Sequence, residues 1–108
     1  MSWYVLDDDG VPRQVPWEEG ARAFEDAERR TVAREELQID GENVLVSTVF
    51  LGVDHNFGTG RPVLFETMVF GGRWDDWQWR YETIEHARTG HDRVVADLRA
   101  GTKPDSAG

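Results

Sequence analysis

The dipeptide Asp40-Gly41 constrains the fold of this chain more than any other feature of its sequence. It separates two extended runs, residues 31–39 and 42–51, and it supplies the two positive-φ residues that a tight hairpin turn needs. The cross-strand pairs that this turn predicts are Leu37 with Val44, Glu35 with Val46 and Ala33 with Thr48 on one side, and Val32 with Val49 on the other. We therefore expect a sheet built around an antiparallel hairpin.

The second strand of the hairpin, residues 44–51, is apolar on both faces, which predicts a central strand that is at least partly covered on both sides. Three segments outside the hairpin also have the pattern of strands. Residues 63–70 form another apolar run, which Gly71-Gly72 ends, and residues 77–82 alternate between an aromatic face and a polar face. A short first strand is expected at residues 2–6.

Two segments have the periodicity of helices. Pro16 suits the first turn of a helix that reaches Arg30, and Thr83 suits the N-cap of a second one. The apolar stripe of the first helix is Trp17, Ala21, Phe24 and Ala27, and that of the second is Ile84, Ala87, His91, Val94 or Val95, and Leu98. The pattern predicts an α+β fold, an antiparallel four- or five-stranded sheet with two helices packed mainly on one face.

The second face of that sheet lacks a predicted cover. Two helices can cover only about one face of a sheet this wide, which leaves apolar residues of the hairpin on the other. These residues are Val32, Leu45, Val49 and Leu51. A homodimer or a partner protein would cover them, and the alternative is that long side chains and the N-terminal segment suffice.

Length and composition favour one small domain. A chain of 108 residues has the usual size of a single domain, which we place at residues 1–100, followed by a disordered tail at 101–108. The absence of cysteine excludes disulfides, thiolate metal sites and cysteine nucleophiles. Residues 1–9 lack the basic and apolar regions of a secretory signal, so we expect a soluble protein of the cytoplasm.

The charge balance restricts the class of partner. Lys and Arg number 12 against 21 Asp and Glu, a net charge of −9, and this field repels phosphate backbones and anionic lipids. Direct binding to nucleic acid or to a membrane is therefore disfavoured. Acidity of this kind serves solubility, or it lets a protein occupy a basic groove on another protein.

Residues 47–57, Ser-Thr-Val-Phe-Leu-Gly-Val-Asp-His-Asn-Phe, resemble a family of small uncharacterised proteins encoded by actinobacterial tailed phages and prophages. The likeness continues through residues 64–72, Arg80-Tyr81 and Gly90-His91, about half of the chain. It departs at Val53, at Ile84 and across the Trp- and Asp-rich turn 73–77. The resemblance implies a phage-type accessory protein and carries over no catalytic residue.

The sequence offers histidine chemistry at two places. Asp54-His55 is the pair from which a hydrolase could be built, with the carboxylate orienting the imidazole, although no nucleophile motif accompanies it. His86 and His91 lie about 140° apart around a helix and cannot chelate a metal from one face. We expect no metal and no cofactor, and we interpret His91 as a hydrogen-bonded core histidine.

The candidate binding residues lie in the long loop after the hairpin and in the Trp-rich turn. They combine glycine-rich backbone, one histidine, two arginines and aromatic side chains outside regular elements. They are Asp54, His55, Asn56, Phe57, Arg61, Arg73, Trp74 and Trp77. We expect Trp74 to be exposed as a contact residue and Trp79 to pack in the core.

Three functions remain open. The first is a non-enzymatic accessory protein that binds a host or rival protein, as a counter-defence factor would. The second is a protein that sequesters a small nucleotide-like, anionic ligand between the loop and the turn. The third is a hydrolase that uses His55.

Overall fold

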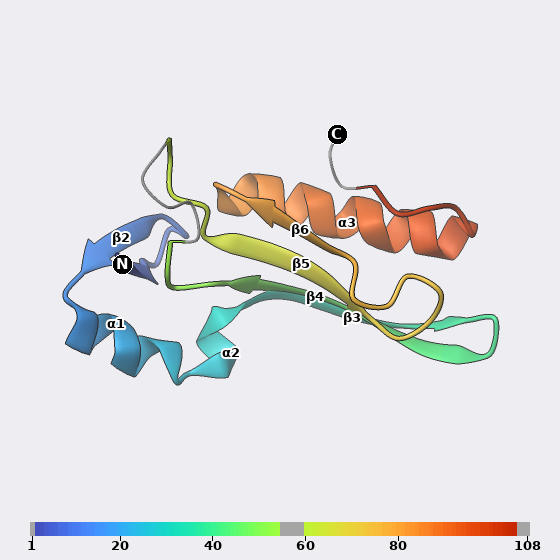
Figure 1. The fold of residues 1–108 in the computed structure, drawn as a ribbon, viewed down its shortest axis with the longest axis horizontal. Coiled ribbons are helices and arrows are strands. Elements are labelled where there is room, and N and C mark those ends of the chain that lie inside the picture. The colour runs from blue at the N-terminus through green and yellow to red at the C-terminus, as the bar shows by residue number, and fades with distance from the viewer. Residues whose placement is uncertain (1, 55–59, 106–108) are drawn as a thin grey trace.

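A computed structural model describes residues 2–54 and 60–105 (Figure 1). The elements in chain order are β1 (Trp3–Leu6), β2 (Pro12–Val15), α1 (Trp17–Phe24), α2 (Ala27–Arg30), β3 (Thr31–Ile39), β4 (Glu42–Phe50), β5 (Phe65–Phe70), β6 (Gln78–Tyr81) and α3 (Ile84–Ala100). Strands β3, β4, β5 and β6 form one antiparallel sheet in that order, and β1 and β2 form a separate two-stranded sheet. The predicted α+β class and the antiparallel four-stranded sheet are confirmed.

The hairpin has the predicted turn and, over most of its length, the predicted register. Asp40 and Gly41 have φ values of 51° and 82°, the conformation that a two-residue turn between antiparallel strands requires. The pairs Leu37 with Val44, Glu35 with Val46, and Ala33 with Thr48 are all present. Local turn chemistry alone was enough to fix this register.

The predicted pair of Val32 with Val49 is wrong, because the hairpin contains a bulge. The register shifts between Thr31 and Ala33, so that Thr31 faces Val49. The extra residue, Val32, packs against the buried cluster that contains Phe50 and Phe65. A β-bulge adds one residue to a strand and turns the following side chains to the other face.

Helix α3 covers one face of the four-stranded sheet and contacts all four strands. Its buried stripe is Ile84, Ala87, Gly90, His91, Val94, Val95 and Leu98. This contains the predicted stripe, with Gly90 added and both valines buried. Val94, Val95 and Leu98 pack against Leu37, Val44, Val46 and Val69, while Ile84 and Ala87 pack with Phe50, Leu64 and Phe65. The helix begins where expected, since the hydroxyl of Thr83 accepts a hydrogen bond from the amide of His86 at 3.1 Å.

The predicted first helix is broken into two. It is interrupted at Glu25 and Asp26, and the carboxylate of Asp26 caps the second piece by accepting a hydrogen bond from the amide of Arg29. The predicted stripe of α1 is also wrong, because Trp17 is 65% exposed and Phe24 is 41% exposed. The buried residue of α1 is instead Gly20, where a Cβ would lie 2.6 Å from Cβ of Trp3.

The helix α1 therefore rests on β1 and not across the four-stranded sheet. Strand β1 joins the main body through a hydrogen bond from the amide of Tyr4 to the carbonyl of Gly52, at 2.8 Å, and through an isolated bridge between Trp3 and Val53. Tyr4 and Leu6 pack against the buried cluster around Phe50. In Figure 1, α1 and α2 lie away from α3, at the end of the sheet where β3 begins.

The chain after α3 turns back along that helix. Gly101 adopts the left-handed conformation at the helix C-cap. Pro104 is buried, and the amide of Asp105 donates a hydrogen bond to the carboxylate of Asp97 at 3.0 Å. Of the predicted tail, residues 106–108 lie outside the described residues.

Among the residues described, no helix has both the length and the apolar character needed to cross a membrane.

The contact between α3 and β6 predicts an unusual response to alanine at Gly90. Glycine is the poorest ordinary helix former, and alanine in its place normally stabilises a helix by about 1 kcal/mol. Here a Cβ would lie 2.6 Å from Cζ of Tyr81. We expect Gly90→Ala to lower the free energy of unfolding by about 1–2 kcal/mol through overpacking, as measured by urea denaturation.

The control is Thr89→Ala on the exposed side of the same helix, which should raise stability slightly. A Gly90→Ala protein as stable as the parent would show that the close approach of Tyr81 to α3 is wrong.

Candidate functional site

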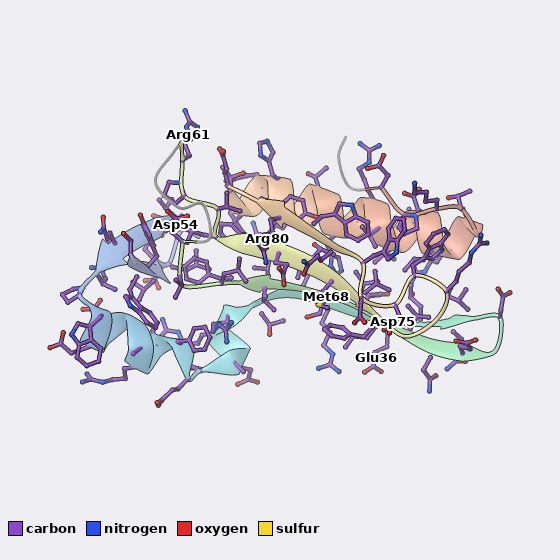
Figure 2. The ribbon with its side chains drawn as sticks, in the orientation of Figure 1. Glu36, Asp54, Arg61, Met68, Asp75 and Arg80 are labelled. Atoms are coloured by element: carbon purple, nitrogen blue, oxygen red, sulfur yellow. The ribbon has the colours of Figure 1, made fainter. Side chains whose placement is uncertain are left out.

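The face of the four-stranded sheet opposite α3 is a candidate interaction surface, which we call the open face. Its residues alternate along each strand with those that contact α3. They are Arg34, Glu36 and Gln38 of β3, Leu45, Ser47 and Val49 of β4, Glu66, Met68 and Phe70 of β5, and Gln78 and Arg80 of β6. Figure 2 shows Met68 and Glu36 on the side of the sheet away from α3.

An apolar stripe runs along the two central strands of the open face. Leu45 pairs with Phe70, and Met68 lies opposite Ser47. Phe70 is 43% exposed, and Leu45, Val49 and Met68 are only half-buried. Of the four residues expected on a face without a helical cover, Leu45 and Val49 lie on this face in the described part of the chain, whereas Val32 packs against the buried cluster of Phe50 and Phe65.

Two ion pairs border this apolar stripe. Arg34 lies 3.2 Å from Glu36 on the β3 side, and Arg80 lies 3.0 Å from Glu66 on the β6 side. The pair of Arg34 with Glu36 is exposed on both sides and contributes little to stability, whereas Glu66 in the other pair is mostly covered. Their effect is to make the border of the open face polar and nearly neutral.

The Trp-rich turn between β5 and β6 is held by its own backbone. Asp76 has a φ of 70°, and the carboxylate of Asp75 accepts a hydrogen bond from the amide of Gly71 at 2.6 Å. The rings of Trp74 and Trp77 meet edge to face with centroids 4.8 Å apart. The turn is thus a folded unit in which the tryptophans contact one another.

The expectation that Trp74 is the exposed contact residue is not met. Trp74 is partly buried and packs against the cluster of Leu37, Val46 and Leu98, as Trp79 does. Trp77 is the more open ring, at 37% exposed, with the Lys103 ammonium 5.3 Å from its centroid. The Arg73 guanidinium lies 4.7 Å from the centroid of Trp74, and both residues line a cavity of only about 120 Å³.

The described ends of the long loop do not lie beside the Trp-rich turn. Asp54 and Arg61 lie at the end of the sheet near β1, whereas Asp75 of the turn lies toward the other end (Figure 2). The carboxylate of Asp54 accepts a hydrogen bond from the amide of Val63 at 3.1 Å, so it fastens the base of the loop. Arg61 is exposed. His55, Asn56 and Phe57 lie outside the described residues.

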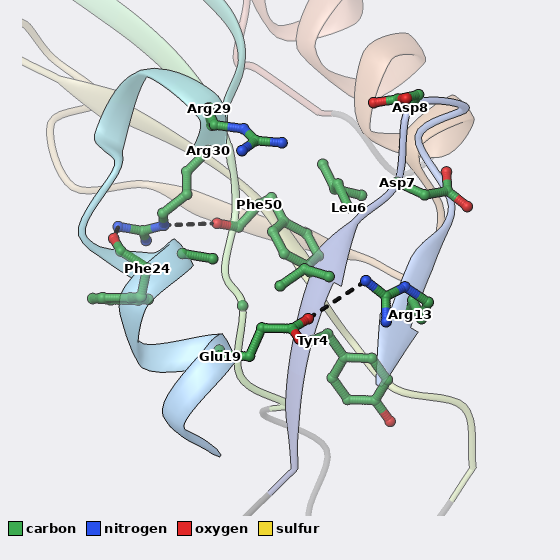
Figure 3. Close-up of a pocket in the computed structure, with 14 residues that line it drawn as sticks. Tyr4, Leu6, Asp7, Asp8, Arg13, Glu19, Phe24, Arg29, Arg30 and Phe50 are labelled. Atoms are coloured by element: carbon green, nitrogen blue, oxygen red, sulfur yellow. Dashed lines mark hydrogen bonds and ion pairs between the residues drawn. The ribbon is translucent and has the colours of Figure 1, made fainter. Parts of the chain in front are cut away.

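One cleft in the described chain was not predicted from the sequence. This cleft has a volume of about 420 Å³ and is formed by β1, β2, α1, α2 and the end of β4 (Figure 3). Its lining residues are Tyr4, Val5, Leu6, Asp7, Asp8, Arg13, Glu19, Gly20, Ala23, Phe24, Arg29, Arg30, Phe50 and Gly52. These residues come from distant parts of the chain. The adjacent pair Arg29-Arg30 is the local feature of the sequence that could have indicated a binding site here.

Arg30 forms a fixed wall of the cleft. Its Nε donates a hydrogen bond to the carbonyl of Phe50 at 3.2 Å, and its Nη1 donates one to the carbonyl of Phe24 at 3.4 Å. The guanidinium stacks 3.8 Å from the centroid of the Phe24 ring. Burial lowers the pKa of Arg30 from its ordinary value, and the side chain stays charged because that value is so high.

A chain of buried hydroxyl and imidazole groups lies in the core beneath α3. The hydroxyls of Thr48 and Thr67 are 2.5 Å apart, and Nδ1 of His91 lies 2.8 Å from the hydroxyl of Thr48. All three residues are buried, which confirms the interpretation of His91 as a hydrogen-bonded core histidine. Burial lowers the pKa of His91, and the nearby carboxylates of Asp92 and Glu35 oppose this effect in part.

Within residues 2–54 and 60–105, no group of three or more His, Asp or Glu side chains is arranged to hold a metal ion.

Comparison with protein-family models, with curated proteins and with solved structures finds no match to this chain. The resemblance to actinobacterial phage proteins stays a prediction from the sequence.

The buried His91 predicts a loss of stability in mild acid. Because its pKa in the fold lies below the ordinary value of about 6.5, the unfolded chain takes up the proton first as the pH falls. The contribution of neutral His91 is complete above that value and decreases below it. We expect the free energy of unfolding of the parent to fall between about pH 7.5 and about pH 5.

His91→Gln keeps a side chain that can hydrogen-bond to Thr48 but cannot titrate, so this pH dependence should become smaller. Exposed His86→Gln is the control and should retain the dependence of the parent. The same loss of stability in His91→Gln as in the parent would contradict this assignment.

Proposed function

We propose that this protein acts by docking its open face onto a partner protein that carries net positive charge. The observation that carries the proposal is the apolar stripe of Leu45, Val49, Met68 and Phe70, which runs along the centre of a sheet face without a described cover. Exposed apolar surface of this kind, bordered by polar groups, is typical of protein interaction sites.

The stripe has the residue types and the arrangement of an interface centre. Aromatic and methionine side chains are enriched in interface cores, and Phe70 lies beside Leu45 with Met68 two positions before it on β5. The ion pairs of Arg34 with Glu36 and of Arg80 with Glu66 would form the polar rim. A rim of paired charges contributes specificity and excludes water more than it contributes affinity.

The charge of the chain supports a basic partner over a second copy. Two copies at −9 each repel, whereas a positively charged partner is attracted and approaches faster. Asp75 and Asp76, both exposed in the turn that follows Phe70, extend negative charge beyond that end of the stripe. Complementary basic residues on the partner are therefore expected near this turn.

The resemblance to phage-encoded proteins supports a host protein or a protein of a rival phage as the partner. A phage accessory protein acts in the cytoplasm of the infected cell, where its partner would be a host protein or a protein of a rival phage. Counter-defence is the role that fits such an encounter.

The direct test is site-specific crosslinking. A photoreactive phenylalanine analogue at position 70 should capture a partner from a lysate of an actinobacterial host, and the purified partner should then bind and crosslink at the same position. The same analogue at position 17, a more exposed aromatic site on α1, is the control and should not capture it.

With the purified partner, Phe70→Ala should weaken binding at least about tenfold, because truncation of a central aromatic anchor commonly costs more than 1 kcal/mol. Trp17→Ala should leave affinity unchanged, and neither variant should lower the melting temperature greatly, since both side chains are more than one-third exposed. A partner that binds Phe70→Ala as tightly as the parent, or crosslinks only at position 17, would show that the open face is not the docking surface.

A further inference from the structure

We propose that the cleft beneath β1 binds a small organic anion that has a planar, apolar body and one anionic group, a phosphate monoester or a carboxylate. The proposal is independent of the docking function, because the cleft and the open face share none of their residues. It also differs in place from the ligand site expected between the long loop and the Trp-rich turn.

The volume and the walls of the cleft suit the body of such a ligand. A space of about 420 Å³ lies within the range of pockets that hold drug-sized molecules, which is roughly 300–1,000 Å³. Part of its lining is aromatic or aliphatic, with Phe50 near its centre and Leu6 and Tyr4 on the β1 side (Figure 3). Flat apolar groups bind well between such side chains because both surfaces leave water and the rings can stack.

Arg29 provides the group that would bind the anion. In Figure 3 its guanidinium extends from α2 toward Leu6, across the space between the helix and β1. Among the described residues its side chain has no hydrogen-bond or ion-pair partner, whereas the other arginines of the cleft have theirs. A guanidinium can bind a phosphate or a carboxylate through two parallel hydrogen bonds.

Arg30 supports this role by its fixed position. Its guanidinium is held between two backbone carbonyls and the Phe24 ring, so its positive charge stays on the α2 side of the cleft. Its positive charge, on the same helix as Arg29, adds to the attraction of this side of the cleft for an anion.

The acidic residues of the cleft set a limit on the charge of the ligand. Glu19 is paired with Arg13 at 3.4 Å, and the carboxylate of Asp7 accepts hydrogen bonds from the amides of Asp9 and Val11, both at 2.9 Å. Figure 3 places Asp7 and Asp8 beyond Leu6, on the rim opposite α2. A ligand with its anionic group at one end fits this polarity, and a long polyanion such as a triphosphate would be repelled.

The experiment is isothermal titration of the full chain with two probes, adenosine 5′-monophosphate for the phosphate class and 1-naphthoate for the carboxylate class. At least one should bind saturably with one site per chain, and the one that binds identifies the anionic group. Adenosine and inorganic phosphate, the two halves of the first probe, and adenosine triphosphate should each bind at least about tenfold more weakly than the intact monophosphate.

Variants then assign the site. Arg29→Gln should weaken binding of the better probe at least about tenfold, and Ala23→Leu should abolish it by filling the cleft. Arg22→Gln, an exposed arginine of α1 that does not line the cleft, should bind as the parent does. In nuclear magnetic resonance spectra, the probe should shift the backbone amides of Leu6, Phe50 and Gly52.

The absence of saturable binding for both probes at millimolar concentration would overturn the proposal. So would binding that Arg29→Gln and Ala23→Leu both leave unchanged, because the ligand would then occupy another place. Since Arg29 is exposed, unfolding is not expected to explain its loss, and a melting curve of each variant checks this.

Discussion

The packing of one long helix on one face of a four-stranded sheet determines most of this structure. α3 has 17 residues, and its single apolar stripe can cover only one side of the sheet. The core is therefore on that side, where Val46, Thr48, Phe65, Thr67 and Val69 are fully inaccessible to solvent. The alternate side chains of the same central strands are left half-exposed, and this produces the open face.

Polar groups inside the core help to fix how the helix sits on the sheet. Apolar packing alone tolerates small shifts of a helix along a sheet, whereas buried polar groups must find their partners. His91 of α3 meets the hydroxyl of Thr48 on β4, which in turn meets Thr67 on β5. The chain of hydrogen bonds therefore ties α3 to the two central strands at one register.

The sequence predicted the structure correctly where residues close together in the chain determine it. The Asp40-Gly41 turn set the hairpin register, and the cap at Thr83 with its apolar stripe located α3. Long-range effects were missed. The bulge at Val32 and the break at Asp26 depend on how β3 and α1 meet the rest of the fold, which local periodicity does not report.

The candidate sites also divide into features that the sequence predicts and features that depend on long-range contacts. The uncovered side of the sheet could be predicted, because the count of helices was too small for two faces. The exposure of Trp74 could not, since it depends on contact with Leu98 and its neighbours from the other end of the chain. The cleft was missed because its walls come from β1, β2, α1, α2 and β4, and only folding brings them together.

The sheet of the isolated protein has one covered and one open face. Leu45 and Val46 are neighbours on β4 with side chains on opposite faces, so their methyl groups report directly on each face. The measurement is methyl relaxation in the presence of a soluble paramagnetic probe. We expect strong relaxation for the Leu45 methyls and little for those of Val46, and equal protection of both would show that this face is covered.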